Sequence, residues 1–436
     1  MGTEYVNGVI DWRGFIPPHW DIGRFRYLFR FGRGIDITKA DLQDEGLPCV
    51  SYGEIHSRYG FEVSPETCAL RCVDLENPEI SQSSMLGKGD FVFADTSEDV
   101  EGSGNFTYLN SDSEVIAGYH TVIARPYERD ASRFYAYLFD SIPFRAQIRS
   151  KVYGIKVFSI TQAILKDARL PLPPKTEQQA IVRYLDPHIT KIDEVLADLA
   201  SQAEMLDTYK RELIAATVTK GLDKAAPMKD SGIEWIGEIP AHWEQYPLFA
   251  VAKENTIKNT GMAYDNLLSL SYGRIIQKDI NMNFGLLPAN FEGYQIVQPG
   301  YTVLRLTDLQ NDKRSLRTGY VTETGIITSA YLGLIPSSRL DSKYFTYLLH
   351  AFDLLKIYYR LGGGIRQTLK FTDMKRLPVL IPSLPEQEQI VEFIDTKTVK
   401  VNELIADIDA QTEKLRQYRQ IVIHDAVTGK IKVSEG

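Results

Sequence analysis

Residues 177–223 read EQQAIVRYLDPHITKIDEVLADLASQAEMLDTYKRELIAATVTKGLD, and residues 386–430 read EQEQIVEFIDTKTVKVNELIADIDAQTEKLRQYRQIVIHDAVTGK. The two stretches match without a gap, at the single offset that carries 177 to 386. The matched positions are Glu177-Gln178 with Glu386-Gln387, Ile181-Val182 with Ile390-Val391, Asp186 with Asp395, Tyr209 with Tyr418, and Val218-Thr219 with Val427-Thr428. A repeat of this length predicts that the chain consists of two related halves.

Both copies have the apolar spacing of long helices. Apolar residues step by three and four along a narrow seam, at Ile189, Ile192, Leu196, Leu199, Ala203, Leu206 and Leu213, and again at Val401, Leu404, Ile408, Leu415, Tyr418 and Val422. A narrow seam is typical of a coiled-coil pair. Pro187 after Asp186 suggests a cap and a first turn, so we expect a short helix before the long one. The alternative is two unrelated helices, each on its own domain, but the constant offset favours a pair.

Length and composition predict a soluble globular protein of two or three domains. The chain has 436 residues, of which 44% are hydrophobic and 24% charged,. Its opening residues lack a basic stretch followed by an apolar one, and no apolar run is long enough to span a membrane. We therefore expect a cytoplasmic protein without a membrane partner.

The cysteines do not indicate a disulfide framework or a metal site. Cys49, Cys68 and Cys72 are an odd number and form no CxxC pair,. Cys68 and Cys72 together with His56 would supply three ligands, whereas a structural zinc needs four. We expect ordinary buried thiols.

Charge is distributed unevenly along the chain. The net charge of −8 argues mildly against nucleic acid as a partner, but residues 229–385 hold 17 Lys and Arg against 14 Asp and Glu. Basic clusters stand at Arg24, Arg26, Arg30 and Arg33; at Arg145, Arg149, Lys151 and Lys156; at Lys313, Arg314 and Arg317; and at Arg366, Lys370, Lys375 and Arg376. Local patches, not the total charge, determine phosphate binding.

The repeat extends beyond the helices. The pattern W-x-G-x-I-P-x-H-W occurs at 12–20 and at 235–243, and its prolines predict an extended segment anchored by tryptophans,. We interpret His19 and His242 as packing or capping residues without a partner for catalysis. Further matched landmarks are Ser-Tyr-Gly at 51–53 and 271–273, turn and strand at 89–93 and 300–304, strands at 116–123 and 326–333, helices from 133 and 343, and Arg-Leu-Pro at 169–171 and 376–378,.

This order of parts resembles the specificity subunit of type I restriction–modification systems. The resemblance rests on the helix openings from Leu170 to Asp186 and from Pro378 to Asp395, on the endings Ala216–Gly221 and Ala426–Gly429, and on the W-x-G-x-I-P-x-H-W segments. It covers essentially the whole chain. The first half departs from the second in one loop, where Tyr153-Gly154-Ile155-Lys156 stands in place of the triple glycine 362–364.

The resemblance implies an α+β fold in which two mixed α/β target recognition domains are separated by two long antiparallel coiled-coil helices, with a pseudo-twofold internal repeat. The expected boundaries are 1–176 and 224–385 for the domains, and 177–223 and 386–436 for the helices. Each domain would read one half of a split double-stranded DNA site, and the helices would fix the spacer. Two modification subunits, which methylate adenine N6, and restriction subunits would bind this chain. S-adenosylmethionine, ATP and Mg would belong to those partners, with no cofactor bound by this chain.

Candidate DNA-binding residues are Arg, Lys, amide, hydroxyl and glycine residues on the loops, where direct base reading and close approach to phosphates occur. In the first half they are Tyr52, Arg58, Thr96, Ser97, Lys151, Tyr153 and Lys156. In the second half they are Tyr272, Arg274, Arg305, Lys313, Arg314, Arg317, Gly363, Gly364, Arg366, Gln367 and Lys370.

The sequence carries no recognisable catalytic motif. It lacks GxxxxGK[ST], HExxH, GxSxG and the Asn/Asp-Pro-Pro-Tyr/Trp tetrapeptide of adenine methyltransferases,. We therefore expect no catalytic and no metal-binding residues, and assign catalysis to partner subunits. The remaining alternative is a coiled-coil scaffold that joins proteins and reads no DNA. Basic loops on the same side of both domains would favour DNA reading, and scattered ones would favour the scaffold.

Overall fold

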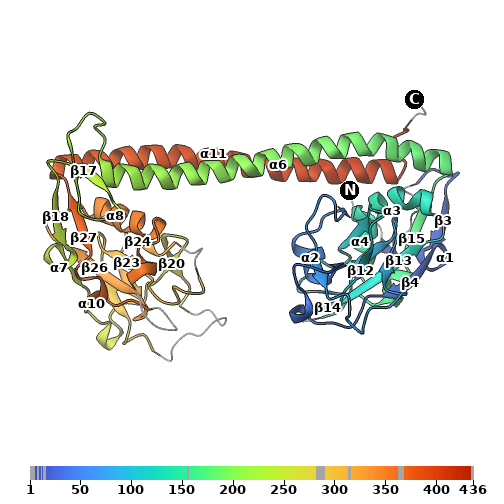
Figure 1. The fold of residues 1–436 in the computed structure, drawn as a ribbon, viewed down its shortest axis with the longest axis horizontal. Helices are drawn as coiled ribbons and strands as arrows, with labels where there is room; N and C mark the ends of the chain where they lie inside the picture. The colour runs from blue at the N-terminus through green and yellow to red at the C-terminus, as the bar shows by residue number, and fades with distance from the viewer. Residues whose placement is uncertain are drawn as a thin grey trace. The chain divides into compact units, whose positions relative to one another are not determined.

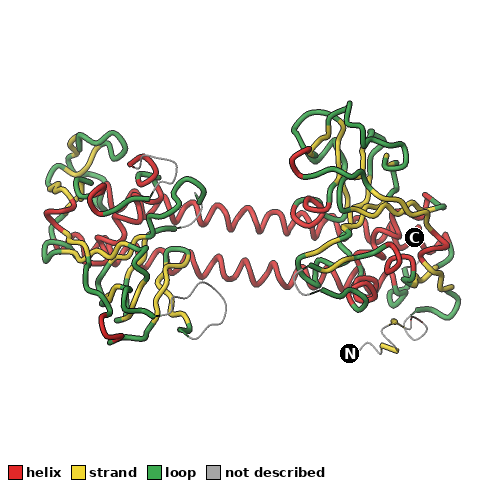
Figure 2. The backbone as a smooth tube through the Cα atoms, turned by 90° about the horizontal axis from the view of Figure 1, so that it is seen from below, coloured by secondary structure: helices red, strands yellow, loops and turns green. Residues whose placement is uncertain are grey.

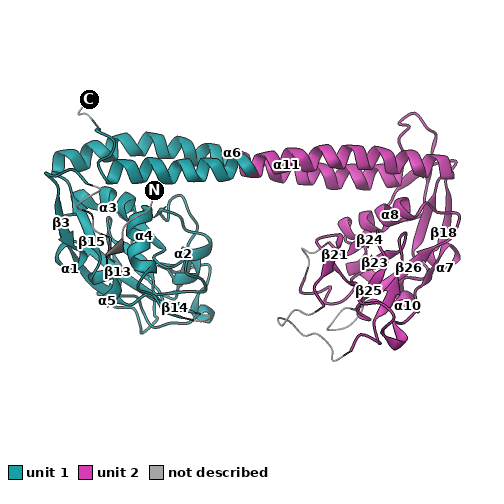
Figure 3. Cartoon of the chain, turned by 180° about the vertical axis from the view of Figure 1, so that it is seen from behind, with its two compact units in different colours: residues 1–198, 410–436 teal, residues 199–409 magenta. Residues whose placement is uncertain are grey.

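The computed structural model describes residues 5–6, 9–10, 12, 16–154, 157–280, 290–312, 316–361 and 368–433. The chain forms two compact units (Figure 3): unit 1 holds 1–198 and 410–436, and unit 2 holds 199–409. Two long helices, α6 (Lys175–Lys220) and α11 (Leu384–Val427), each contribute one part to each unit. Each unit is therefore a mixed α/β domain together with two helix segments (Figure 1).

The core of unit 1 is a five-stranded sheet in the order β4-β13-β9-β11-β6. Its strands are β4 (Phe29–Arg33), β13 (Thr121–Pro126), β9 (Phe91–Ala94), β11 (Phe106–Leu109) and β6 (Glu62–Val63). All pairs are antiparallel except β11 with β6. Every residue of β9, β11 and β13 is buried, which explains why Phe91–Ala94 is a continuous apolar run instead of an alternating one.

A second sheet and four short helices complete the domain of unit 1. The sheet has the order β7-β5-β12-β8, with β7 (Arg71–Val73), β5 (Leu47–Val50), β12 (Val115–Ala117) and β8 (Met85–Leu86). Two-stranded pairs are β3 (Asp21–Arg24) with β15 (Arg169–Leu172), β10 (Thr96–Ser97) with β14 (Phe158–Ser159), and β1 (Tyr5–Val6) with β2 (Val9–Ile10). The helices are α1 (Phe25–Leu28), α2 (Tyr52–Ser57), α4 (Ile142–Arg149) and α5 (Gln162–Lys166), and a longer α3 (Ser132–Asp140) packs in the main core.

Unit 2 repeats this order of paired strands. One sheet runs β19-β26-β23-β24, with β19 (Ala252–Glu254), β26 (Leu332–Pro336), β23 (Thr302–Leu304) and β24 (Thr318–Tyr320). The other runs β21-β20-β25-β22, with β21 (Arg274–Lys278), β20 (Leu267–Ser271), β25 (Gly325–Ile327) and β22 (Gln295–Val297). Unit 2 also contains the pairs β18 (Glu244–Pro247) with β27 (Pro378–Ile381) and β16 (Met228–Asp230) with β17 (Glu238–Pro240). Its described short helices include α7 (Leu248–Val251), α8 (Ser342–Leu354), α9 (Tyr358–Leu361) and α10 (Phe371–Met374).

The structure confirms most of the predicted landmarks and corrects two. Strands β9 and β23 and helices α3 and α8 lie where the sequence predicted them, and the prolines of the two Arg-Leu-Pro segments lie in strands β15 and β27. However, 116–123 and 326–333 are not single strands. In the first, β12 ends at Ala117 and β13 begins at Thr121, because the two ends pair with strands of different sheets. The same split separates β25 from β26.

The second correction concerns Pro187, which does not separate a short helix from a long one. Helix α6 continues from Lys175 to Lys220 with Pro187 inside it. Ile181, Leu185 and Ile189, on both sides of the proline, are buried in one core cluster with α3. This continuous burial holds the helix together although the proline removes one backbone hydrogen bond.

Within each unit, the segment of α6 packs beside the segment of α11 (Figures 1 and 2). In unit 1, Ile189 and Ile192 of α6 share a core cluster with Val422 and Ile423 of α11. Arg419 joins them by ion pairs from Nε to Asp193 (2.8 Å) and from Nη1 to Asp140 at the end of α3 (2.6 Å). In unit 2, Ile214 and Val218 of α6 share a cluster with Ile390 and Ile394 of α11, and Lys210 Nζ donates to Asn402 Oδ1 (3.2 Å).

A carboxylate in the first turn of each long helix receives two side chains of the I-P-x-H-W motif. In unit 1, the Trp20 indole N–H donates to Glu177 Oε2 (2.9 Å), and His19 Nε2 lies 2.8 Å from Glu177 Oε1. In unit 2, Trp243 and His242 make the same contacts with Glu386, at 3.0 and 2.9 Å. The two histidines therefore have a structural partner, in agreement with their interpretation from the sequence as packing or capping residues.

The same tryptophans also contact the end of the other long helix. A Cβ on Gly429, after α11, would lie 2.5 Å from Pro17 Cδ and 3.1 Å from the Trp20 ring. A Cβ on Gly221, after α6, would lie 3.2 Å from the Trp243 ring. Both glycines have a positive φ, +70° and +72°, which is typical of helix C-termini. Each unit thus fixes the start of one long helix and the end of the other.

The repeated aspartates attach each helix to its domain. Asp186 accepts from Arg133 Nε (2.9 Å) and Tyr137 Oη (2.6 Å), both on α3. Asp395 accepts from Lys343 Nζ (2.6 Å) and Tyr347 Oη (2.5 Å), both on α8. The donors are four residues apart on one helix face in both units, which places them side by side.

Candidate nucleic-acid interface

A cavity of about 790 Å³ lies in unit 1 between α2 and the segment that follows β9. Three of the expected DNA-binding residues line it, namely Tyr52, Thr96 and Ser97. The other lining residues are Gly53, His56, Ser57, Glu98, Asp99, Glu101, Gly102, Asn105, His120 and Val157. The cavity therefore brings together residues that the sequence separates by more than forty positions.

A chain of hydrogen bonds holds the wall of this cavity in place. Because the carbonyl of Thr96 can only accept, His56 donates to it from Nε2 (2.7 Å) and accepts at Nδ1 from the Asn105 amide (3.0 Å),. Asn105 Oδ1 in turn accepts from Arg145 Nη1 (2.6 Å). Arg149 donates to the carbonyl of Glu101. The segment 95–105 is thus fastened at several points to α2 and α4, and His56 has a hydrogen-bonding role.

The loop before α5 joins the same region of unit 1. Strands β10 and β14 pair Thr96 with Ser159 and Ser97 with Phe158, and Val157 lines the cavity. Strand β14 lies at the end of unit 1 opposite to α6 (Figures 1 and 3). Tyr153 is 86% exposed. Lys151 is instead paired with Asp167, and this hydrogen bond holds the pKa of Asp167 below its ordinary value.

Unit 2 brings the equivalent segments together. Tyr272 and Gly273 form the two-residue turn between β20 and β21, and a Cβ on Gly273 would lie 3.2 Å from Leu316 Cβ. The backbone N–H of Leu369 donates to the carbonyl of Leu306 (3.0 Å), as that of Ile160 donates to Asp95 in unit 1 (2.7 Å). The turn, the segment after β23 and the segment before α10 are therefore neighbours.

Arg317 is an expected DNA-binding residue, but its side chain lies inside unit 2. Its side chain is fully buried. Nη1 donates to the carbonyls of Arg305 (3.0 Å) and Thr307 (2.8 Å), Nη2 donates to those of Asp308 (3.4 Å) and Asp312, and Nε donates to Tyr359 Oη (3.0 Å). Five donors in a planar fork suit this task. In this structure the guanidinium is used within unit 2, and no sequence signal distinguishes it from an exposed arginine.

The remaining expected residues are partly exposed or lie outside the described residues. Arg274 is exposed on β21, Lys370 is exposed before α10, and Arg305 Nη2 lies 3.8 Å from Asp312. Arg58 is exposed after α2 but does not line the cavity. Outside the described residues are Lys156, Lys313, Arg314, Gly363, Gly364, Arg366 and Gln367.

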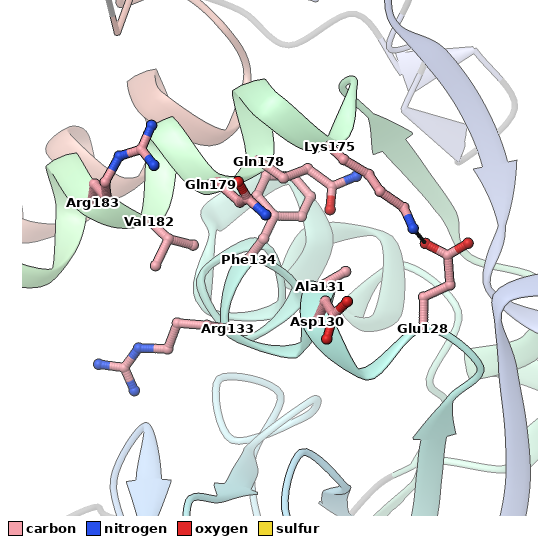
Figure 4. Close-up of a pocket in the computed structure, with 10 residues that line it drawn as sticks. All are labelled: Glu128, Asp130, Ala131, Arg133, Phe134, Lys175, Gln178, Gln179, Val182 and Arg183. Atoms are coloured by element: carbon pink, nitrogen blue, oxygen red, sulfur yellow. Dashed lines mark ion pairs between the residues drawn. The ribbon is translucent and has the colours of Figure 1, made fainter. Parts of the chain in front are cut away.

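Unit 1 has a second hollow, of about 250 Å³, where α3 meets the first turns of α6 (Figure 4). Phe134 and Val182 form its apolar wall, and Arg133, Lys175 and Arg183 line it as well. Lys175 Nζ pairs with Glu128 (2.9 Å). This hollow adjoins the long helix α6, whereas the larger cavity is lined by α2 and the segment after β9.

Among the described residues, no group of three His, Cys, Asp or Glu side chains is arranged to hold a metal ion. Within the same part of the chain, no helix combines the length and the apolar character needed to cross a membrane.

Comparison with known proteins gives the family. The family described as Type I restriction modification DNA specificity domain matches residues 78–204 and 317–414, together more than half of the chain. Each matched segment contains the same parts, from the sheet of one domain through most of the long helix that follows. The chain therefore belongs to the specificity subunits of type I restriction–modification systems, whose part is DNA sequence recognition.

Several distant relatives span nearly the whole length of the chain. The putative type I restriction enzyme MjaX specificity subunit of Methanocaldococcus jannaschii is 22% identical over 432 residues, covering 96% of this chain and 95% of that protein. The type I restriction enzyme StySPI specificity subunit of Salmonella potsdam is 20% identical and covers 92% and 89%. A chain in a structure that concerns assembly and conformational transition of the type I R-M system has the same fold, with a TM-score of 0.66, 16% identity, and coverage of 95% and 99%.

Proposed function

We propose that the two domains each read one half of a bipartite double-stranded DNA site, as one subunit of a larger complex. The observation that carries this proposal is the tandem family match, since one specificity domain stands in each half of the chain. The domains share a strand order but differ in their loops. A reader of this kind recognises two different half-sites, because loops carry specificity while the scaffold only positions them.

The two long helices form one antiparallel coiled-coil pair that sets the distance between the half-sites. Two contacts support this pairing, Asp193 with Arg419 in unit 1 and Lys210 with Asn402 in unit 2. In both contacts the two residue numbers add to the same value, as a single antiparallel register requires. Equal attachments at Asp186 and Asp395 support the pseudo-twofold arrangement of the domains about this pair.

The helices and the adjoining sides of the domains dock two modification subunits and the restriction subunits. The hollow between α3 and α6 is a candidate docking surface, because it combines an apolar wall with exposed Arg183. Catalysis belongs to those partners, which bind S-adenosylmethionine, ATP and Mg and methylate adenine N6. This chain contributes sequence reading in the cytoplasm and no cofactor.

The test is coexpression with the modification subunit encoded beside it, followed by single-molecule sequencing of the host DNA for N6-methyladenine. We expect a split motif with a methylated adenine in both halves. Exchange of residues 1–170 with those of a relative should then change one half only. Association without a methylated split motif would contradict DNA reading, and a chain that binds other proteins but no DNA would be a scaffold.

A further inference from the structure

We propose that residues 95–105 of unit 1 (reading loop 1) and 305–312 of unit 2 (reading loop 2) are the segments that read the bases, and that Arg317 is the positioning residue of reading loop 2. This inference rests on the proposed function and deepens it. The two loops follow corresponding strands, β9 and β23, and precede corresponding strands, β11 and β24. In unit 1, reading loop 1 lines a cavity together with Tyr52 of the Ser-Tyr-Gly motif, and in unit 2 the glycine of that motif, Gly273, lies against Leu316, next to Arg317.

Arg317 and two buried leucines, Leu306 and Leu309, hold reading loop 2 in place. Four of its backbone carbonyls accept from one guanidinium, and the backbone N–H of Arg305 donates to the carbonyl of Arg317 (2.9 Å). The backbone N–H of Arg317 donates to Asp353 (2.6 Å), a carboxyl whose pKa is raised by burial. Burial of a charged side chain is unfavourable unless all its donors are hydrogen-bonded. The burial of the Arg317 guanidinium against the loop carbonyls therefore indicates that the conformation of reading loop 2 is important.

Tyr272, at the turn whose Gly273 lies against Leu316, is an independent sign of function. It is 83% exposed and has a φ of +45°. A two-residue hairpin turn with positive φ favours Asn, Asp or Gly at this position, and a tyrosine there is strained. An exposed, strained aromatic side chain has no role in the core of unit 2. Its exposure on the turn between β20 and β21 suits contact with a ligand.

Reading loop 1 is positioned by a different set of side chains. Asn105, directly before β11, occupies the place that Arg317 has directly before β24. It connects Arg145 to His56, which donates to the Thr96 carbonyl. A Cβ on Gly102 would lie 2.4 Å from Ser97 Oγ and 3.3 Å from the His56 ring, so this loop packs closely on its support as well.

The exposed side chains of the two loops suit different base edges. Reading loop 1 carries Asp95, Glu98, Asp99 and Glu101 and no Lys or Arg. Carboxylates accept hydrogen bonds, so this loop suits the exocyclic amino groups of cytosine and adenine in the major groove. Reading loop 2 exposes Gln310 and Asn311 and carries Arg305. Amides pair with adenine and arginine pairs with guanine.

The experiment uses the full chain coexpressed with its modification subunit, and compares the methylated motif of three variants with wild type. Arg317→Lys keeps the charge but loses the planar fork. Gln310→Ala removes an exposed side chain of reading loop 2, and Glu98→Gln removes a charge from reading loop 1. Thermal unfolding of each purified complex is the second readout, because a merely structural role would shift melting without changing specificity.

We expect Arg317→Lys and Gln310→Ala to relax only the half-site that is not changed by exchanging residues 1–170. Methylation at singly mismatched sites in that half should rise at least about tenfold, the factor that 1.4 kcal/mol of lost discrimination produces. Glu98→Gln should alter only the other half. Gln310→Ala should melt with the wild type, so it tests base reading by reading loop 2 even if Arg317→Lys does not accumulate folded. An Arg317→Lys complex that folds and keeps the wild-type motif would overturn the positioning role of Arg317.

The inference is overturned if wild type yields a split motif while Gln310→Ala and Glu98→Gln leave both halves unchanged. It is also overturned if these variants relax both halves equally. A wild-type complex that yields no split motif is a different result, because it contradicts the proposed function instead.

Discussion

Replacement of Glu177 by alanine should loosen the attachment of α6 to unit 1 by about 2–3 kcal/mol. The change leaves the buried indole N–H of Trp20 without its acceptor at 2.9 Å, which costs about 1–3 kcal/mol. It also removes a negative charge from the first turn of α6, which costs about 0.3–1 kcal/mol. The contact with His19 adds little, because that side chain is more than half exposed,.

The loss corresponds to a decrease in melting temperature of roughly 4–12 °C for a unit of this size. Differential scanning calorimetry of the purified chain measures it, and hydrogen–deuterium exchange of the first turns of α6 assigns the change to unit 1. Glu177→Gln is the matched control, since it keeps an oxygen acceptor for the indole and should lose less than half as much. Glu386→Ala should produce the equivalent loss in unit 2, where Trp243 donates to Glu386 at 3.0 Å.

Two outcomes would refute this reasoning. Glu177→Ala could melt within about 1 °C of the wild type, in which case the indole N–H finds another acceptor and the contact is not important. Alternatively, Glu177→Gln could be as destabilised as Glu177→Ala, in which case charge alone, and not the hydrogen bond, accounts for the effect.

Gly429→Ala should lower the free energy of unfolding in urea by about 2 kcal/mol or more, because Gly429 has a positive φ and a Cβ there would clash with Pro17,. Gly221→Ala should lower it less, because the nearest atom to a Cβ at that position is 3.2 Å away. Arg419→Met should cost about 2–4 kcal/mol by the same measurement, since its buried carboxylate partner Asp140 is left less well paired,. Lys210→Met, at the equivalent position, should cost under about 1 kcal/mol. Burial, with the nearby charges of Lys210 and Arg211, lowers the pKa of His350 to about 4. His350 therefore binds a proton at a higher pH in the unfolded chain than in the folded chain, and the free energy of unfolding should fall by up to about 3 kcal/mol as the pH drops from 6.5 to 4. His350→Gln should flatten that part of the pH profile.

The repeat and most elements of the fold could be predicted from the sequence, because they rest on local patterns. The paired helix openings, the strands β9 and β23 and the helices α3 and α8 each have a signature within a few residues. Pro187 was misleading for the same reason. A proline is a strong local signal, but burial of Ile181, Leu185 and Ile189 in one core outweighs it,.

The candidate interface could be predicted only in part. The sequence identified Tyr52, Thr96 and Ser97, which line one cavity, because polar residues after a buried strand indicate an exposed loop. It missed His56 and Asn105, and it took Arg317 for an exposed residue. These roles depend on contacts between distant positions, such as His56 with Thr96 and Arg317 with Asp353. The partner of His19, Glu177, was missed for the same reason.

The boundaries of the domains also follow from contacts of this kind, and they lead to a last prediction. The backbone N–H of Phe25 donates to the carbonyl of Ala168 (2.9 Å), directly after β3 and before β15. In unit 2, Leu248 donates to Leu377 (2.9 Å) at the same place, directly after β18 and before β27. The chain therefore enters and leaves the body of each domain at one point, and the strand pair closes this point off.

A graft of residues 25–168 from a relative should therefore transfer specificity for one half-site with less loss of stability than a graft of residues 1–170. The shorter graft keeps the host's own His19 and Trp20 against Glu177 and Gly429, whereas the longer one replaces both side chains and divides β15. Melting temperature and the methylated motif of the two chimeras measure the difference. If the shorter graft unfolds earlier than the longer one, the part of the domain that determines specificity is not separable from its attachment to the helices.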